Sequence, residues 1–315
     1  MTNMNEIYEM LEKLTPNEIK MVKQYLWNDN SDFEITDGVV LEEYTGDDED
    51  VIIPDFITTI KSSAFPSFSE VSSITIPDSV VNIGNAFSEN DCLREIKFGK
   101  GVKTIGTEAF SGCSQLCNIT VDKDNPYYRV QDGILYSLKD NKLDTLIVAP
   151  KNLRGKVIIP EGVTKICDLS FQYCSNITNV VIGKNVKSIG VWAFSECENL
   201  QGVTLSDSVE TIDMWAFNEC TSLTTVKFGK GLKRIGKVAF AECIKFSELD
   251  LPEGLEEIED AAFVNCSSLN NITIPKSVQR IGERVFEHCN NLSSLSIPSH
   301  LKEYFKDINC EINTI

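Results

Sequence analysis

The sequence predicts a solenoid of stacked parallel strands, and two observations lead to that fold class. A small residue followed by Phe, or Val followed by Phe, recurs nine times between Ala64-Phe65 and Val285-Phe286, and from Phe171 onward the spacing is always 23 residues. Val226-Lys227-Phe228 and its equivalents alternate apolar and polar side chains, which is the period of a short strand with one buried face. Self-similarity at such a period indicates a repeat architecture.

Alternating charges support stacking in register. The two residues between Leu232 and Ile235 are charged, and the sign of the charge at each of these positions alternates from one repeat to the next. On a parallel ladder each charge would then lie between two opposite charges. The first column is Lys187, Glu210, Lys233 and Glu256, and the second is Arg234, Glu257, Arg280 and Glu303.

The repeated unit resembles that of a known family. It reads Ile-x-Ile-Pro-x-x-Val-x-x-Ile-Gly-x-x-Ala-Phe-x-x-Cys, illustrated by Ile274-Pro275, Val278, Ile281-Gly282, Phe286 and Cys289. This pattern resembles the BspA-type (Treponema-type) leucine-rich repeat family over residues 33–297. The resemblance implies a curved leucine-rich-repeat solenoid with parallel β-strands on one face and loops or short 3-10 turns on the other. It also implies a non-catalytic binding scaffold, in a family rich in bacterial surface and adhesin-like proteins.

An insertion interrupts the repeats. The interval from Phe110 to Phe171 is 61 residues, and Asp132-Gly133 inside it has the chemistry of a tight hairpin turn. Residues 145–148 would add a further strand, and residues 33–40, with Asp37-Gly38, look like a partial copy that opens the solenoid. The predicted organisation is an N-terminal helical cap at 1–28, leucine-rich repeats at 29–121, a β-hairpin insertion at 122–156, further repeats at 157–300 and a C-terminal cap at 301–315.

Both ends are predicted to cover the open core of the solenoid. Ile7, Met10, Leu11 and Leu14 share one helical face, and Thr15-Pro16-Asn17-Glu18 has capping-box spacing. A helical cap is the expectation, because a solenoid must hide its open end. A detachable helical hairpin that docks a partner or dimerises is the alternative. At the other end, residues 301–308 abandon the repeat and are expected to close the core.

Charge and composition limit the function. The 315 residues include 47 Asp and Glu against 29 Lys and Arg, a net charge of −18, which disfavours nucleic acid and anionic membrane surfaces as partners. Eleven of the acids lie between Asp29 and Asp55, with no Lys or Arg among them. No apolar run has the roughly 18 residues of a membrane span, and no signal-peptide pattern is visible. We expect a cytoplasmic protein as written, or a surface or extracellular protein if another route exports it.

Cysteine recurs three residues after the repeated Phe, as Cys113, Cys174, Cys197, Cys220, Cys243, Cys266 and Cys289. We predict that this column fills the core as a small hydrophobe, since it lacks the paired Cys spacing of zinc sites. The run Asp47-Asp48-Glu49-Asp50 could offer oxygens to calcium, but we interpret four consecutive acids as a solvated turn. With two His and no nucleophile or phosphate-loop motif, we predict no enzyme activity, no cofactor and no metal.

The outward residue of each strand triplet defines the predicted protein-binding face. Its candidate residues are Thr75, Lys97, Thr120, Thr204, Lys227, Asp250 and Thr273. The face lacks the Trp, Tyr and Arg clusters of binding hot spots, so a plain solvated ladder is an equal alternative. Its apolar exceptions, Ile158 and Val181, are expected to lie under the insertion. The candidate insertion contacts are an aromatic tip of Tyr127, Tyr128 and Tyr136, and a hairpin that only rides on the stack is the alternative.

The leading hypothesis is a non-enzymatic scaffold that binds an unknown protein through the sheet face and the insertion. If the chain is exported, the partner belongs to a host or neighbouring cell. The runner-up is a glycan-binding adhesin, for which Tyr127 and Tyr128 near Asp124 and Asn125 offer aromatic and polar groups. An intracellular regulatory binding module and an enzyme with a site in the insertion or cap are the remaining alternatives.

Overall fold

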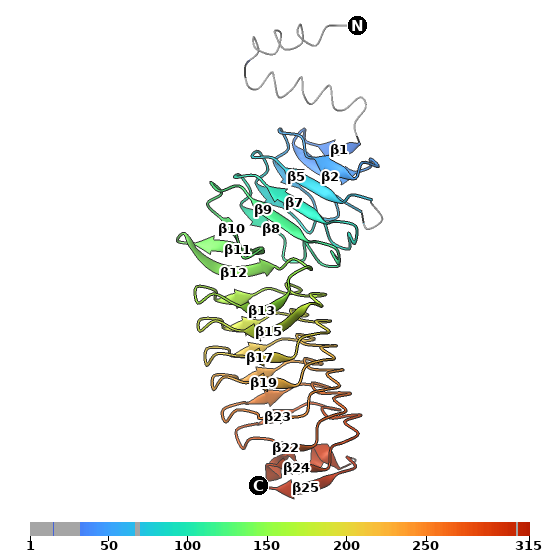
Figure 1. Ribbon diagram of the computed structural model, residues 1–315, viewed down its shortest axis with the longest axis vertical. Helices are drawn as coiled ribbons and strands as arrows, with labels where there is room; N and C mark the ends of the chain where they lie inside the picture. The colour runs from blue at the N-terminus through green and yellow to red at the C-terminus, as the bar shows by residue number, and fades with distance from the viewer. Residues whose placement is uncertain (1–14, 16–31, 67–69, 307) are drawn as a thin grey trace. The chain divides into compact units, whose positions relative to one another are not determined.

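The computed structural model describes residues 15, 32–66, 70–306 and 308–315 (Figure 1). The predicted helical cap at 1–28 lies outside the described residues except for Thr15. The described chain divides into two compact units. The first takes the residues up to 115 together with Thr120–Asn125, and the second takes Leu116–Ile119 and Pro126–Ile315. Each unit is a stack of short parallel strands.

An antiparallel hairpin begins the first unit, as expected for residues 33–40. Its turn residues Asp37 and Gly38 have φ values of 49° and 66°, in the left-handed region that Asp and Gly adopt readily in tight turns. The hairpin's second strand, β2, then pairs in parallel with β4, giving a sheet of order β1-β2-β4-β6-β8 beside a second sheet β3-β5-β7-β9. The strands are β1 (Phe33–Thr36), β2 (Val40–Tyr44), β3 (Asp50–Ile52), β4 (Thr59–Ile60), β5 (Ser73–Ile76), β6 (Asn82–Ile83), β7 (Glu95–Phe98), β8 (Thr104–Ile105) and β9 (Asn118–Val121).

The insertion is a three-stranded antiparallel meander of β10 (Tyr128–Gln131), β11 (Ile134–Lys139) and β12 (Lys142–Val148). The predicted Asp132-Gly133 turn is confirmed, with φ values of 52° and 81°. A second positive-φ turn at Asp140-Asn141 adds the third strand. Because β12 pairs in parallel with β14 through Leu146 and Ile166, the insertion is part of the solenoid's sheet and does not merely ride on it.

Most later repeats of the second unit contribute two short strands, so that β13, β15, β17 and β19 form successive rungs (Figure 1), whereas the repeat after β20 contributes only β21. The first sheet contains β13 (Gly155–Ile158), β15 (Ile177–Val181), β17 (Gly202–Thr204) and β19 (Thr225–Lys227), and a three-stranded sheet follows with β22 (Asn271–Thr273), β24 (Ser294–Ile297) and β25 (Glu311–Thr314). The opposite sheet adds β14 (Lys165–Ile166), β16 (Ser188–Ile189), β18 (Thr211–Ile212), β20 (Arg234–Ile235), β21 (Glu257–Ile258) and β23 (Arg280–Ile281) to the meander. The predicted loops are present as turns, for example at residues 191–196, but this side also carries strands, because the repeated Ile anchors a two-residue strand.

A column of Phe rings forms the centre of the second unit's core. Phe194, Phe217 and Phe240 stack with centroids 5.1 Å apart and ring planes within 5° of parallel. These rings are fully buried. The apolar triplet residues and the repeated Ile pack around them, so one continuous core runs through the unit.

Turn residues with positive φ aim backbone groups at the next rung. Trp215 and Glu219 have φ values of 62° and 58°, and their equivalents in neighbouring repeats share this conformation. The N–H of Trp215 donates to the carbonyl of Lys237 at 3.0 Å, and that of Glu219 donates to the carbonyl of Ala241 at 2.9 Å. These inter-rung bonds offset the steric cost of about 1–2 kcal/mol per left-handed residue.

The C-terminal segment closes the stack with one helix and one more strand. The helix η1 (Ser299–Phe305) is the single 3-10 helix in the described part of the chain. It buries Leu301 and Phe305, and Phe305 stacks on Phe286 with centroids 6.2 Å apart. The repeat pattern is interrupted at η1, and β25 then pairs in parallel with β24 and adds another rung.

Candidate binding surface

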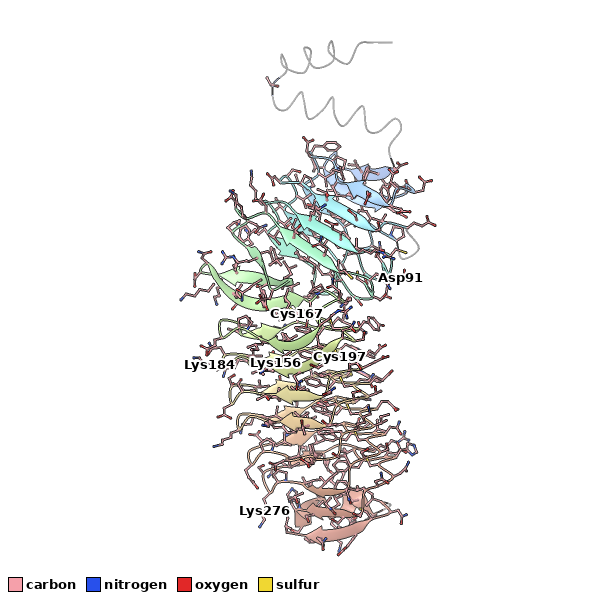
Figure 2. All side chains as sticks on the ribbon, in the orientation of Figure 1. Asp91, Lys156, Cys167, Lys184, Cys197 and Lys276 are labelled. Atoms are coloured by element: carbon pink, nitrogen blue, oxygen red, sulfur yellow. The ribbon has the colours of Figure 1, made fainter. Side chains whose placement is uncertain are left out.

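The sheet β13-β15-β17-β19 brings the outward side chains of the second unit into line. Ile158, Val181, Thr204 and Lys227 occupy successive rungs in register. Side chains alternate between the two faces of a strand, so Val203 is buried while Thr204 beside it is exposed. Lys156 lies on the first of these rungs (Figure 2). We call this surface, together with its continuation over β22 and β24, the sheet face.

The remaining predicted residues fall into two groups. Asp250 and Thr273 continue the sheet face and are joined by an isolated parallel bridge. In the first unit, Thr75 and Lys97 are in register on β5 and β7, and Thr120 lies on β9, the next strand of that sheet. The structure thus brings the predicted residues together within each unit.

The predicted cover over the apolar residues of the sheet face is absent. The side chain of Ile158 is 63% exposed, and that of Val181 is partly exposed. The insertion uses its third strand to extend the opposite sheet, so it does not shield these rungs. The first two rungs of the sheet face therefore offer apolar contact area.

The predicted aromatic tip of the insertion is wrong for two of its three tyrosines. Tyr136 is 1% exposed and packs into the core, and Tyr128 is also buried. Burial raises the pKa of the Tyr136 phenol. The alternation of β11 turns Tyr136 toward the core, on the same side as Ile134. Only Tyr127 remains as a candidate contact, with 38% of its surface exposed.

The sheet face is interrupted where residues 246–251 pass between β19 and β22. Backbone pairing there reduces to single bridges, Thr225 with Glu248 and Asp250 with Thr273. The segment 248–251 reads Glu-Leu-Asp-Leu and lacks the β-branched residues that favour strands, whereas β19 reads Thr-Val-Lys. A hollow of about 1200 Å³, the β19–β22 groove, lies at this point. Its lining includes Lys227, Lys230, Glu248, Asp250, Glu253 and Asn271.

The predicted ladder of charges forms on the opposite sheet, in part. Lys187 contacts Glu210 at 2.7 Å, and Lys233 contacts Glu256 at 2.9 Å. In the second column, Arg280 donates to both carboxylate oxygens of Glu257, at 2.8 and 2.9 Å. These bonds hold the pKa of the Glu257 carboxyl below its usual range.

Two members of the second column find other partners. Arg234 bonds to Asp213 and Glu259, which directly follow the repeated Ile in the neighbouring rungs, instead of to Glu257. Its long guanidinium fork reaches both carboxylates at once. Glu303 lies in η1, outside the repeat, and pairs with Lys306. The predicted pairing is therefore wrong for these two residues.

The predicted cysteine column is buried, and its thiols make a regular set of contacts. The Cys220 thiol donates to the carbonyl of Phe194 at 3.1 Å, and Cys243 donates to Phe217 at 3.2 Å. Cys197, which Figure 2 labels, contacts Phe171 in the same way. Burial raises the pKa values of the Cys220 and Cys243 thiols, which disfavours the reactive thiolate. The column packs the core, as predicted, and also links each rung to the preceding one.

Neither a metal cluster nor a membrane helix is found in the part of the chain that the structure describes. There, no three His, Cys, Asp or Glu side chains are grouped so that they could hold a metal ion. The acidic run 47–50 is exposed, and the Asp48 amide donates to the Tyr44 hydroxyl at 3.2 Å. Among the same described residues, no helix has the length and apolar character needed to cross a bilayer.

The repeat sequence itself decides the family. A sequence profile described as BspA type Leucine rich repeat region matches residues 43–144, 151–243 and 219–315, in six copies. The chain belongs to the BspA-type leucine-rich repeat family. No curated protein matches this BspA-type chain.

Solved structures share the fold of this BspA-type protein at low sequence identity. The pneumococcal vaccine antigen PcpA is 19% identical with a TM-score of 0.57, over 82% of this chain and 71% of the antigen. A leucine-rich repeat protein from Eubacterium ventriosum is 20% identical with a TM-score of 0.53, over 79% and 88% of the two chains. One from Bacteroides ovatus is 22% identical with a TM-score of 0.50, over 90% and 97%. These similarities establish the fold.

Sequence reasoning missed three charged residues of the β19–β22 groove. Lys230, Glu248 and Glu253 line it, but none occupies the outward triplet position on which the predicted face was based. The available signal was the Glu-Leu-Asp-Leu segment, whose weak strand preference marks the point where the BspA-type repeat loses its sheet pairing.

Proposed function

We propose that this BspA-type protein is a non-enzymatic scaffold that binds a partner protein through the sheet face of its second unit. One observation carries the proposal. Thr204 and Lys227 stand exposed and in register beside the β19–β22 groove. A rigid surface of regularly spaced side chains suits protein recognition, because little conformational freedom is lost on binding.

A surface or adhesin-like setting is part of this proposal, and it rests on the family. The exposed Ile158 and the partly exposed Val181 supply an apolar end to the sheet face, next to polar rungs at Thr204 and Lys227. A buried apolar centre with a polar rim is the usual composition of a protein interface. The Tyr127 side chain of the insertion is a secondary contact in this proposal.

Site-specific photo-cross-linking of the full chain tests the proposal. A benzophenone amino acid is placed at Thr204 on the sheet face or, as the matched control, at Lys165 on the opposite sheet, and each protein is exposed to arrayed extracellular proteins. We expect a partner that cross-links from Thr204 and not from Lys165. A partner that cross-links equally from both positions, or no partner from either, would contradict the proposal.

Point substitutions are preferable to removal of the insertion. Deleting residues 122–156 would take Tyr136 and Leu146 out of the core, so lost binding would not identify a contact. Tyr127→Ala and Lys227→Glu change exposed side chains and leave the core intact. We expect Lys227→Glu to weaken binding more than Tyr127→Ala does.

A further inference from the structure

The break in the sheet ladder is confined to the sheet face. At the same repeats the opposite sheet continues, since β20 pairs with β21 and β21 pairs with β23. The Phe column also continues, with Phe240 and Phe263 stacked 5.4 Å apart at 4°. Phe246, which replaces the Leu of other repeats, packs against both rings. The fold is therefore maintained where the face is hollowed.

The groove contains charges of both signs that find no ion-pair partner among the described residues. Lys227 and Lys230 line the side that belongs to the β19 repeat, and Glu248, Asp250 and Glu253 follow in the next repeat. All five side chains are exposed, and no salt bridge within the described residues includes any of them. The opposite sheet differs, because Lys233 and Glu256 of the same two repeats are paired at 2.9 Å.

Neutral hydrogen-bond donors lie on the far side of the groove. The Asn271 carboxamide oxygen accepts from the hydroxyls of Ser294 and Ser293, at 2.7 and 3.2 Å. The Asn270 oxygen also accepts from Ser293. These bonds occupy the oxygens and leave the amide nitrogens as donors for a ligand. Such donors suit the carbonyl groups of an extended peptide.

The lining disfavours two other ligand classes. Phe228 is the one aromatic residue among the groove's lining residues, all of which the structure describes, and its ring packs edge-on against Phe240 at 5.9 Å. This single ring is partly buried against the core, so it offers little area on which a sugar could stack. Three acidic side chains repel a phosphate backbone. A polypeptide can offer acidic, basic and carbonyl groups together.

We infer that the β19–β22 groove takes an extended peptide segment of the partner that carries charges of both signs in separate blocks. Basic side chains of this segment lie over Glu248, Asp250 and Glu253, and an acidic block lies over Lys227 and Lys230. The inference rests on the proposed function, because it names the chemistry of the partner that binds the sheet face. The unpaired charges of the groove then determine which peptide binds and in which direction it lies.

Fluorescence polarisation with labelled twelve-residue peptides and the full chain tests this inference. One peptide carries three Glu followed directly by three Lys, with three Gly or Ser residues at each end. A second has the same composition with alternating signs, and a third replaces every Glu by Lys to measure attraction to the net charge of −18. We expect the block peptide to bind roughly tenfold more tightly than the alternating one, because only it sets separate opposite charges over the two neighbouring repeats that carry Lys227 and Asp250.

Neutral variants locate the binding. Glu248→Gln, Asp250→Asn and Glu253→Gln together are expected to weaken the block peptide by roughly tenfold. The matched control neutralises Glu161, Glu210 and Glu256, which are exposed and paired elsewhere, and should change binding less than about twofold. Thermal melts of both variants check that each remains folded.

Two results would overturn the inference. If both triple variants weaken the block peptide equally, binding follows net charge and not the groove. If no peptide is preferred while a partner still cross-links from Thr204, the peptide inference fails and the proposed function stands. The proposed function itself fails only if no partner cross-links selectively from Thr204, whatever the peptides show.

Discussion

The regular repeats before residue 243 and the repeat that follows differ mainly on one face. In the regular repeats, Thr204 and Lys227 are held in register by a continuous parallel ladder. Between residues 246 and 251 that ladder reduces to single bridges, while the Phe column and the opposite sheet continue unchanged. A repeat therefore keeps its place in the stack through its core and the opposite sheet, even where its sheet-face strand is reduced to single bridges. The sheet face is therefore free to vary in a way that the core is not.

The largest expected effect comes from breaking the core of a regular repeat. Phe217 is fully buried between Phe194 and Phe240, with both ring centroids 5.1 Å away. Phe217→Ala should lower the free energy of unfolding by about 3–5 kcal/mol, because it leaves a cavity in the stack. Urea denaturation of the full chain measures this. If Phe217→Ala lowers the free energy of unfolding no more than Phe228→Ala does, at a partly buried ring, the Phe column does not stabilise the stack more than other apolar contacts do.

A smaller effect is expected from the thiol that links two regular rungs. Cys220→Ala removes the S–H donor to the Phe194 carbonyl and should cost about 1 kcal/mol of stability. Cys92 is exposed, so Cys92→Ala should change stability by less than about 0.5 kcal/mol. The two denaturation midpoints give the comparison. Equal midpoints would mean that the thiol contact adds nothing to the stacking.

The smallest effect is expected from the charges of the opposite sheet. Lys187 and Glu210 are exposed and 2.7 Å apart, so a double-mutant cycle to Ala should give a coupling of about 0.2–1 kcal/mol that falls with added salt. The control is a double-mutant cycle of Lys187 and Glu256, because Glu256 pairs with Lys233 and not with Lys187. It should give no coupling. Coupling of equal size in both cycles would indicate a general charge effect.

Sequence periodicity predicts most of this fold because each rung repeats the same local preferences. The 23-residue spacing places Thr204 and Lys227 on neighbouring strands, and the structure confirms their register. It does not predict the orientation of Tyr136, because Ile134-Leu135-Tyr136 is an unbroken apolar run in which alternation gives no signal. Arg234 similarly has opposite charges within reach on several positions, and only the three-dimensional arrangement selects Asp213 and Glu259.

The groove was less predictable than the face on which it lies. Asp250 was identified from its outward position, but a strand was expected at its rung. The weak strand preference of Glu248, Leu249, Asp250 and Leu251 outweighs the register imposed by neighbouring repeats. A strong repeat signal conceals such a local failure, because the Phe and Cys positions around it are unchanged.

Hydrogen exchange measured on the full chain tests most directly whether the broken ladder is confined to the sheet face. The account predicts that backbone amides of residues 247–251 exchange at least about tenfold faster than those of β17, β19 and β22, because single bridges protect them less than a continuous ladder does. Amides of β20 and β21 in the same repeats should stay protected. Equal protection of 247–251 and its neighbouring strands would contradict the account.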